Sequence, residues 1–278
     1  MSDRICEGRI FEGATRLHAW PADARATQYG DGLFETMRVH GGVVPWFDAH
    51  WARLAAGAAR MKLALPARGD VEAALHDVFD DRGDGVAKLL LSRGGGGRGY
   101  APVAVAPALW RLSRHDLPPA ARAGGVVLRW CETRLALQPA LAGLKHCNRL
   151  EEVLARAEWD DPAIDDGLLL DAEGFVACAT SANVFVLHGD RWSTPRMDRC
   201  GVAGVCRAWV REATGADETR LAPSALASAD AVLLCNAVRG ILPVARLDAR
   251  TWAPHPAVAD LRERLGRAHP AFARQEVA

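Results

Sequence analysis

Lys145 is the residue of this sequence with the most specific chemical potential. It lies in LKHCNRL, residues 144–150, between an apolar stretch and a segment that is predicted to be helical. A lysine amine that is removed from water has a lowered pKa and can form a Schiff base with an aldehyde. The alternative is an ordinary surface lysine, because a cation at a helix start is only mildly unfavourable. Other residues must decide between these interpretations.

Three further features could bind an anion such as phosphate. GVAGVCR, residues 201–207, places two glycines and backbone N–H groups at the start of a predicted helix, where the helix dipole favours negative charge. Asn236 ends an apolar strand with a short polar side chain. Arg53 belongs to a predicted helix, and its guanidinium could donate to two phosphate oxygens at once. Each feature is weak alone, so a phosphate site is indicated only by their combination.

RGGGGRGY, residues 93–100, is a second glycine-rich segment. It lacks the Gly-Lys-Ser/Thr ending of a P-loop and the spaced GxGxxG of a dinucleotide fold. A phosphate-binding loop and the tip of a hairpin both stay open as interpretations, and the sequence favours the hairpin tip.

Composition limits the classes of partner. Among 278 residues, 34 basic and 34 acidic side chains balance, and no basic stripe alternates with aromatic residues. We therefore expect a small-molecule substrate, no nucleic acid and no charged membrane. No apolar run approaches the roughly 20 residues of a membrane span, and the N-terminus does not resemble a signal peptide. A cytoplasmic protein is expected.

The cysteines are expected to be reduced thiols rather than disulfides or metal ligands, because their number is odd and no CxxC pair occurs. The seven are Cys6, Cys131, Cys147, Cys178, Cys200, Cys206 and Cys235. His146 and Cys147 are adjacent, and adjacent side chains point in different directions, so no metal site is predicted there.

The elements that must position these residues can be outlined from periodicity. Short apolar runs broken by glycines over residues 9–44 predict an antiparallel meander. Apolar residues at helical spacing over residues 49–63 predict a helix with Asp48 as its N-cap. A second helix is expected at 71–79 and a strand at 85–93.

Two prolines and two glycines within residues 114–125 mark the expected domain boundary. The prediction is a smaller N-terminal α/β domain, residues 1–118, and a larger C-terminal domain, residues 119–278. In the second domain, strands are expected at 126–130, 167–171, 174–181, 183–192 and 231–238, and helices at 148–159, 202–213 and 255–269.

Seven segments share their order and spacing with one family of enzymes. They are RATQYGDGLFETMRV (25–39), HWARL (50–54), LLLSRGGGGRGY (89–100), LKHCNRLEEVLAR (144–156), LLLDAEGFVACATSANVF (168–185), TPRMDRCGVAGVCR (194–207) and LLCNAVRGILPV (233–244). On these segments the sequence resembles the fold type IV pyridoxal phosphate enzymes, the class IV aminotransferase fold. The resemblance covers most of the chain.

The resemblance implies an α/β (α+β) fold of two domains with pyridoxal 5'-phosphate in the cleft between them, and a homodimer whose partner completes each site. It implies that Lys145 holds the cofactor as a Schiff base and moves protons. Arg53 and the amides of Val202 and Ala203 would hold the phosphate, and Arg149 would approach the phenolic oxygen. The further cofactor contacts that it implies come from Cys178, Asn183 and Asn236. Arg98 and Arg38 are candidates for binding substrate carboxylates.

Within the family, RGGGGRGY, LKHCNRLE and the pair CNA and LPV resemble the aminodeoxychorismate lyase branch more than the transaminases. The implied reaction converts 4-amino-4-deoxychorismate to 4-aminobenzoate and pyruvate in folate biosynthesis. Two alternatives remain, a class IV aminotransferase acting on D-amino or branched-chain amino acids and a binding protein without activity.

Cys178 departs from the family pattern, which has a glutamate five residues before Asn183 to pair with the pyridine nitrogen. Glu173 does not replace it, because it fits the turn DAEGF. Transamination depends on a cationic ring as electron sink. Lyase chemistry gains driving force from the aromatic product, so our hypothesis is that the lyase reaction tolerates a thiol at this position.

Overall fold

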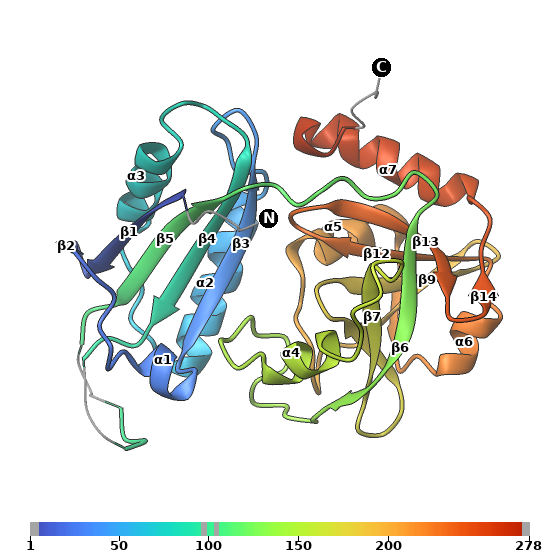
Figure 1. Cartoon of the computed structure of the whole chain (residues 1–278), viewed down its shortest axis with the longest axis horizontal. Helices are drawn as coiled ribbons and strands as arrows, with labels where there is room; N and C mark the ends of the chain where they lie inside the picture. Colours follow the sequence, from blue (N-terminus) through green and yellow to red (C-terminus); the bar gives the residue numbers. More distant parts are fainter. Residues whose placement is uncertain (1–5, 96–98, 103–105, 274–278) are drawn as a thin grey trace. The chain divides into compact units, whose positions relative to one another are not determined.

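The computed structural model describes residues 6–95, 99–102 and 106–273. By its internal contacts the chain divides into two compact units (Figure 1). Unit 1 comprises Met1–Pro118 and Leu144–Asn148, and unit 2 comprises Pro119–Gly143 and Arg149–Ala278. The chain therefore returns to unit 1 for the five residues that include Lys145. A single boundary after Pro118 would assign these five residues to the second domain.

Unit 1 is a five-stranded antiparallel sheet with helices. Its elements are β1 (Cys6–Glu12), β2 (Thr15–Leu17), α1 (Arg25–Tyr29), β3 (Gly32–Val39), α2 (Phe47–Met61), α3 (Arg68–Val78), β4 (Gly85–Ser92) and β5 (Leu109–His115). The strand order is β2-β1-β5-β4-β3. Because β3 lies at one edge, it keeps one side free for a further strand-like segment.

Alternation along β3 explains how the sheet of unit 1 is covered. Leu33, Met37 and Val39 are fully buried, whereas Phe34 and Arg38 between them are partly exposed. Since successive side chains of a strand point to opposite faces, one face is packed and the other is open. The contacts of α2 with β3 and of α3 with β5 and β1 identify the helices that cover the packed face.

The segment Leu144–Asn148 extends the sheet at its β3 edge. His146 forms an antiparallel bridge with Leu33. The Phe34 N–H donates to the Lys145 carbonyl at 2.9 Å, and the Cys147 N–H donates to the Gly32 carbonyl at 2.9 Å. These hydrogen bonds fix the backbone on both sides of the lysine.

Two expectations for unit 1 were wrong. Residues 9–44 do not form a meander, because the short helix α1 precedes β3 and β1 pairs with β5 instead. Asp48 is not the N-cap of α2, which begins at Phe47 after Trp46 in a left-handed conformation with φ 59°. Asp48 lies in the first turn and binds Arg68 at 2.7 Å.

Unit 2 contains a nine-stranded mixed sheet in the order β11-β10-β9-β12-β13-β6-β7-β8, with β14 paired to β13. Its strands are β6 (Val126–Leu135), β7 (Asp166–Asp171), β8 (Val176–Ala179), β9 (Asn183–His188), β10 (Arg191–Pro195), β11 (Asp217–Thr219), β12 (Ala231–Asn236), β13 (Gly240–Leu247) and β14 (Arg250–Thr251). Its helices are α4 (Leu150–Arg156), α5 (Val205–Thr214), α6 (Pro223–Ala227), α7 (Pro256–Ala268) and the 3-10 helix Pro270–Phe272.

The main core of unit 2 consists of small and branched apolar side chains such as Leu168, Val184, Val232 and Leu234, each at most 2% exposed. One expected strand was wrong, because residues 183–192 form the hairpin of β9 and β10, which turns at Gly189. Within the described ranges, no helix combines the length and apolar character needed to cross a membrane.

Candidate active site

Lys145 lies on the open face of the sheet of unit 1. Its side chain is half-buried, and its Nζ lies 4.3 Å from the centre of the Phe34 ring. Lys88 on β4 reaches the same ring, with its Nζ at 5.4 Å from the centre. The chain has three lysines, and two of them therefore share one aromatic ring by cation–π contact.

A buried charge cluster lies on the packed face of the same sheet. Glu35 is 2% exposed and His50 is 1% exposed. The two oxygens of Glu35 accept hydrogen bonds from Arg53, with Nε at 2.8 Å from Oε1, and from His50 Nδ1 at 2.6 Å. Burial raises the pKa of the Glu35 carboxyl, but Arg53 and His50 outweigh it, and the net pKa lies below the ordinary value. Arg53 is thus oriented by a buried carboxylate.

The surrounding charges and burial set the protonation state of His50. Burial lowers the pKa of His50, Glu35 raises it, and the positive charges of Arg53 and Lys145 lower it further. The net pKa is below the ordinary value, so the ring is neutral at pH 7 and its Nδ1–H donates to Glu35. Its Nε2 is then a buried acceptor, and it has no hydrogen-bond partner in the described part of the chain.

The start of α5 in unit 2 presents unused backbone donors. The N–H groups of Val202, Val205 and Cys206 donate to no other described residue, and no side chain caps this helix. Such a helix start favours an anion. The Ala203 N–H differs, because it donates to the Gly143 carbonyl at 3.0 Å. Among the two predicted amides, Val202 is therefore the one that keeps its donor.

Asn183 and Asn236 support this region through hydrogen bonds. Asn183 Nδ2 donates to the Val202 carbonyl at 2.9 Å. A Cβ at Gly204 would collide with the Asn183 side-chain oxygen, so this close approach requires glycine. Asn236 Oδ1 accepts from the N–H groups that follow β12, at 3.0 Å from Val238 and 2.8 Å from Arg239. The two asparagines shape the turns that surround the helix start and the end of β12.

Cys178 lies on β8 opposite Leu169, in a buried apolar cluster that includes Leu135, Ala155 and Trp159. Burial raises the pKa of its thiol well above the ordinary value, and the nearby charge of Glu152 raises it further. The thiol is therefore neutral at pH 7. This neutral group stands at the position where the family pattern has a carboxylate.

Arg149 precedes α4, and its Nη1 lies 2.5 Å from Glu152 Oε1. Arg38 lies on β3 with its side chain on the same face as Phe34, where burial lowers the pKa of its guanidinium and Asp84 raises it. Arg98 falls outside the described residues.

Sequence reasoning did not identify four of these residues. Glu35 and His50 carry a weak signal, since His50 and Arg53 are three residues apart in α2 and face the same way. Lys88 and Arg111 carry no signal in the sequence, because only strand pairing places them on the same face as Phe34. Phe34 pairs with Leu90 on β4, and Leu90 pairs with Arg111 on β5. Neither cation forms an ion pair with another residue that the structure describes.

The structure thus groups the predicted residues by unit. In unit 1, His50 and Arg53 both bind Glu35, and the positive charge of Lys145 contributes to the lowered pKa of His50. In unit 2, Asn183, Val202 and Ala203 meet before α5. Unit 1 thus provides an amine and a guanidinium that a buried carboxylate orients, and unit 2 provides a helix start that suits an anion.

Comparisons with known proteins identify the family of the chain. The model of the family described as amino-transferase class IV matches residues 32–247. Aminodeoxychorismate lyase of Vibrio harveyi is 36% identical over 246 residues, which are 85% of this chain and 90% of the relative.

Solved structures give the same result. The crystal structure of 4-amino-4-deoxychorismate lyase from Pseudomonas aeruginosa has a TM-score of 0.86 and 38% identity, covering 94% of this chain and 99% of that chain. The branched-chain aminotransferase from Thermoproteus uzoniensis with norvaline has a TM-score of 0.83 over 96% of both chains, and its 18% identity shows a likeness of fold alone. The chain belongs to the aminotransferase class IV family.

Proposed function

We propose that this chain is a pyridoxal phosphate-dependent aminodeoxychorismate lyase, which converts 4-amino-4-deoxychorismate to 4-aminobenzoate and pyruvate in folate biosynthesis. The observation that carries the proposal is the identity of 36% and 38% to two lyases over most of each chain. Lys145, in the segment that resembles the lyase branch, supplies the reactive amine.

Pyridoxal phosphate is the cofactor of this family, and the residues present fit most of it. The Val202, Val205 and Cys206 amides at the start of α5 suit its phosphate, as does the oriented guanidinium of Arg53. Lys145 suits its aldehyde, and Arg149 remains the proposed neighbour of its phenolic oxygen. When bound, the cofactor draws electrons from the carbon next to the amino group of the substrate.

Lys145 Nζ is proposed to move the proton of the reaction. The substrate loses a ring proton, its bond from the ring to the enol oxygen breaks, and a proton returns to the three-carbon unit as it becomes pyruvate. The remaining ring becomes aromatic, which favours the release.

The neutral thiol of Cys178 predicts how the chain responds to the family's glutamate. Cys178→Glu should leave pyruvate release unchanged and raise turnover with a 2-oxo acid acceptor, because a carboxylate favours the cationic ring that transamination needs. In the cofactor-free protein the same change should cost about 3 kcal/mol in urea unfolding, because it buries a charge in an apolar cluster beside Glu152. Cys178→Ala is the control. Faster pyruvate release in the glutamate variant would contradict the hypothesis.

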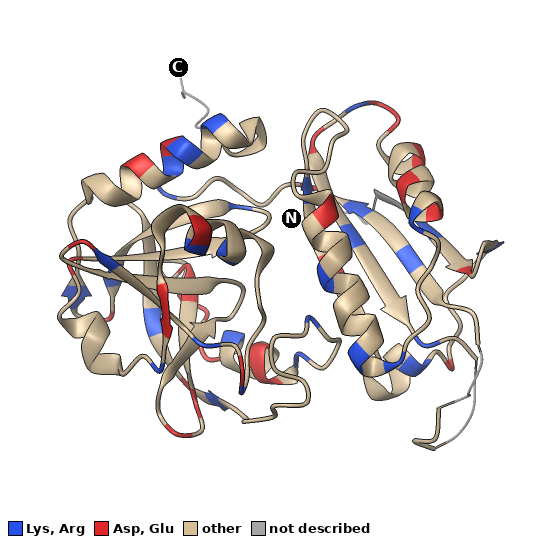
Figure 2. Cartoon of the chain, turned by 180° about the vertical axis from the view of Figure 1, so that it is seen from behind, with Lys and Arg blue, Asp and Glu red and all other residues tan. Residues whose placement is uncertain are grey.

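The cations on the open face of the unit 1 sheet are proposed to bind the carboxylates of the substrate. Figure 2 shows Lys and Arg along the strands of this unit. Lys88 and Arg111 are diagonal neighbours across β4 and β5, and like charges at such positions are unfavourable unless an anion joins them. Arg38 shares this face.

Lys88→Ala should raise KM for 4-amino-4-deoxychorismate about tenfold and change kcat little, because one charge-assisted contact to substrate is lost. Lys88→Arg should recover most of the affinity. Initial rates of 4-aminobenzoate formation measure both. An unchanged KM in the alanine variant would exclude Lys88 from substrate binding.

We also propose that the chain forms a homodimer and works in the cytoplasm. In α4, Leu150, Val153 and Leu154 are 68%, 59% and 55% exposed. Three large apolar side chains on adjacent turns are a surface that a second copy would cover. Sedimentation should give twice the mass of one chain.

A coupled assay tests the proposed function. The purified protein with pyridoxal phosphate should release pyruvate and 4-aminobenzoate from 4-amino-4-deoxychorismate without an amino acceptor. Turnover only when a 2-oxo acid is added would show an aminotransferase instead. A protein that binds no cofactor would support the binding-protein alternative.

A further inference from the structure

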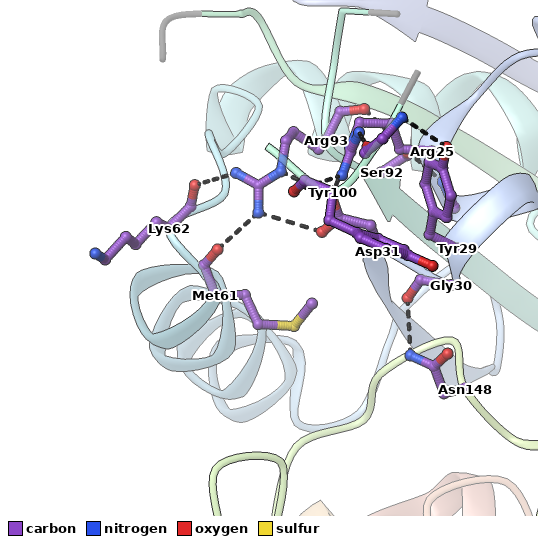
Figure 3. A network of polar contacts seen from close by, with 12 residues as sticks. Arg25, Tyr29, Gly30, Asp31, Met61, Lys62, Ser92, Arg93, Tyr100 and Asn148 are labelled. Carbon is purple, nitrogen blue, oxygen red and sulfur yellow. Dashed lines mark hydrogen bonds and ion pairs between the residues drawn. The ribbon is translucent and has the colours of Figure 1, made fainter. Parts of the chain in front are cut away.

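A cluster of charged side chains in unit 1, centred on Asp31, is separate from the groups described above. Asp31 lies in the turn between α1 and β3, and its side chain is 14% exposed. One of its oxygens, Oδ2, accepts from Nε of Arg25 at 2.8 Å and from Nε of Arg93 at 2.8 Å (Figure 3). Burial raises the pKa of Asp31, but both guanidiniums outweigh it, and the net pKa is lowered. Asp31 is thus a fixed charge.

Arg93 connects Asp31 to the end of α2. Its Nη1 donates to the Lys62 carbonyl at 2.7 Å, and its Nη2 donates to the Met61 carbonyl at 2.9 Å (Figure 3). The last carbonyls of a helix have no partner within the helix, so this guanidinium satisfies two of them. The helix that Arg93 holds in this way carries His50 and Arg53.

The residues on both sides of Asp31 hold the segment that carries Lys145. The Gly30 carbonyl accepts from Asn148 Nδ2 at 3.1 Å, and the Gly32 carbonyl accepts from the Cys147 N–H at 2.9 Å. Gly30 has φ 64°, and a Cβ there would collide with the side chain of Asn148. The contact with Asn148 therefore requires the turn in this conformation.

We propose that Asp31 is a positioning residue for Lys145. Through the turn it fixes the Lys145 segment, and through Arg93 it fixes the end of the helix that carries Arg53. One carboxylate thereby fixes the Lys145 amine and the Arg53 guanidinium relative to each other. The inference rests on the proposed function for the role of Lys145, and the consequence is catalytic because a displacement of about 1 Å can cost up to ~10²-fold in rate.

Asp31→Asn keeps the shape of the side chain and removes its charge. We expect kcat for pyruvate release to fall about tenfold or more, with KM changed less than about threefold, because the amine moves while the substrate contacts stay. Asp81→Asn is the matched control. Asp81 also accepts from an arginine, Arg114 Nη1 at 2.8 Å, and from the Gly83 N–H at 2.9 Å, without a contact to the Lys145 segment. Its kcat should stay within about twofold of the parent.

A double-mutant cycle separates positioning from loss of stability. Asn148→Ala removes an exposed side chain and should lower kcat by about threefold or more. If both residues act through the turn at Gly30, the second substitution adds little. The kcat of the double variant, Asp31→Asn with Asn148→Ala, should then lie within about twofold of the kcat of Asp31→Asn alone. The proposal would be overturned if the kcat losses of the two single variants multiplied in the double variant. It would also be overturned if Asp31→Asn had the same kcat as the Asp81→Asn control. If Asp31→Asn does not fold, an Asn148→Ala variant with unchanged kcat overturns it instead.

The proposed function can fail separately. If the parent protein releases no pyruvate, the same four variants are mixed as apoproteins with pyridoxal phosphate, and the rate at which the visible band forms is measured. Slower, non-additive formation in the Asp31 and Asn148 variants would still support the positioning of Lys145. Equal rates in all variants would overturn it.

Discussion

Lys145→Ala is expected to lower kcat/KM for pyruvate release by at least about 10⁴-fold, because it removes both the covalent anchor of the cofactor and the proton carrier. The fold should remain, since the backbone carbonyl of residue 145 that accepts from the Phe34 N–H is kept. Formation of pyruvate, coupled to its reduction, measures the loss, and far-ultraviolet circular dichroism checks the fold.

Lys145→Arg distinguishes the amine from its charge. Arginine keeps a cation over the Phe34 ring but has no amine that can bond to an aldehyde at neutral pH. It should be as inactive as the alanine variant. Activity in the arginine variant above about one hundredth of the parent would show that charge alone accounts for the role of Lys145.

Arg53→Leu is expected to weaken binding of pyridoxal phosphate about tenfold to hundredfold and to destabilise unit 1 by about 3 kcal/mol. The affinity falls because a guanidinium is lost from the phosphate. The stability falls because Glu35, 2% exposed, keeps only His50 as partner for a buried charge. Fluorescence titration with the cofactor and urea unfolding measure the two effects separately.

The stability loss in Arg53→Leu should depend on pH. In the parent, the lowered pKa of Glu35 gives stability that is present above the unfolded value and is lost as pH falls. In the variant, burial without Arg53 raises this pKa, so the protonated carboxyl is favoured and the stability loss shrinks towards acid pH. The difference from the parent should therefore be larger at about pH 7.5 than at about pH 4.5.

A double variant separates the two effects of Arg53. Arg53→Leu with Glu35→Gln removes both charges, so most of the stability should return while the cofactor affinity stays low. Recovery of affinity in the double variant would mean that Arg53 does not contact the phosphate. A stability loss in the single variant that does not vary with pH would show that Glu35 is not its cause.

Local pattern predicted the parts of the site that depend on neighbours in sequence. The spacing of apolar residues located the helix of Arg53, and the glycines of GVAGVCR located a helix start with unused amides. Both are properties of a few consecutive residues. Their element bounds shifted by a few residues, since helix ends depend on packing and capping.

The remaining features depend on contacts between distant segments. The return of Leu144–Asn148 to the edge of β3 requires a pairing across more than a hundred residues, and no local signal encodes it. The use of the Ala203 amide by Gly143, and the apolar surroundings of Cys178, follow in the same way from tertiary packing. The resemblance to a family supplied roles for residues, which local physics could not.

Mapping of the amine that holds the cofactor tests the central claim most directly. The protein is incubated with pyridoxal phosphate, reduced with borohydride, digested and analysed by mass spectrometry. Only three lysines can carry the label, Lys62, Lys88 and Lys145. We predict the phosphopyridoxyl mass on the peptide that contains Lys145 and a loss of the label in Lys145→Ala. A label on Lys62 or Lys88 alone, or no label at saturating cofactor, would contradict the account.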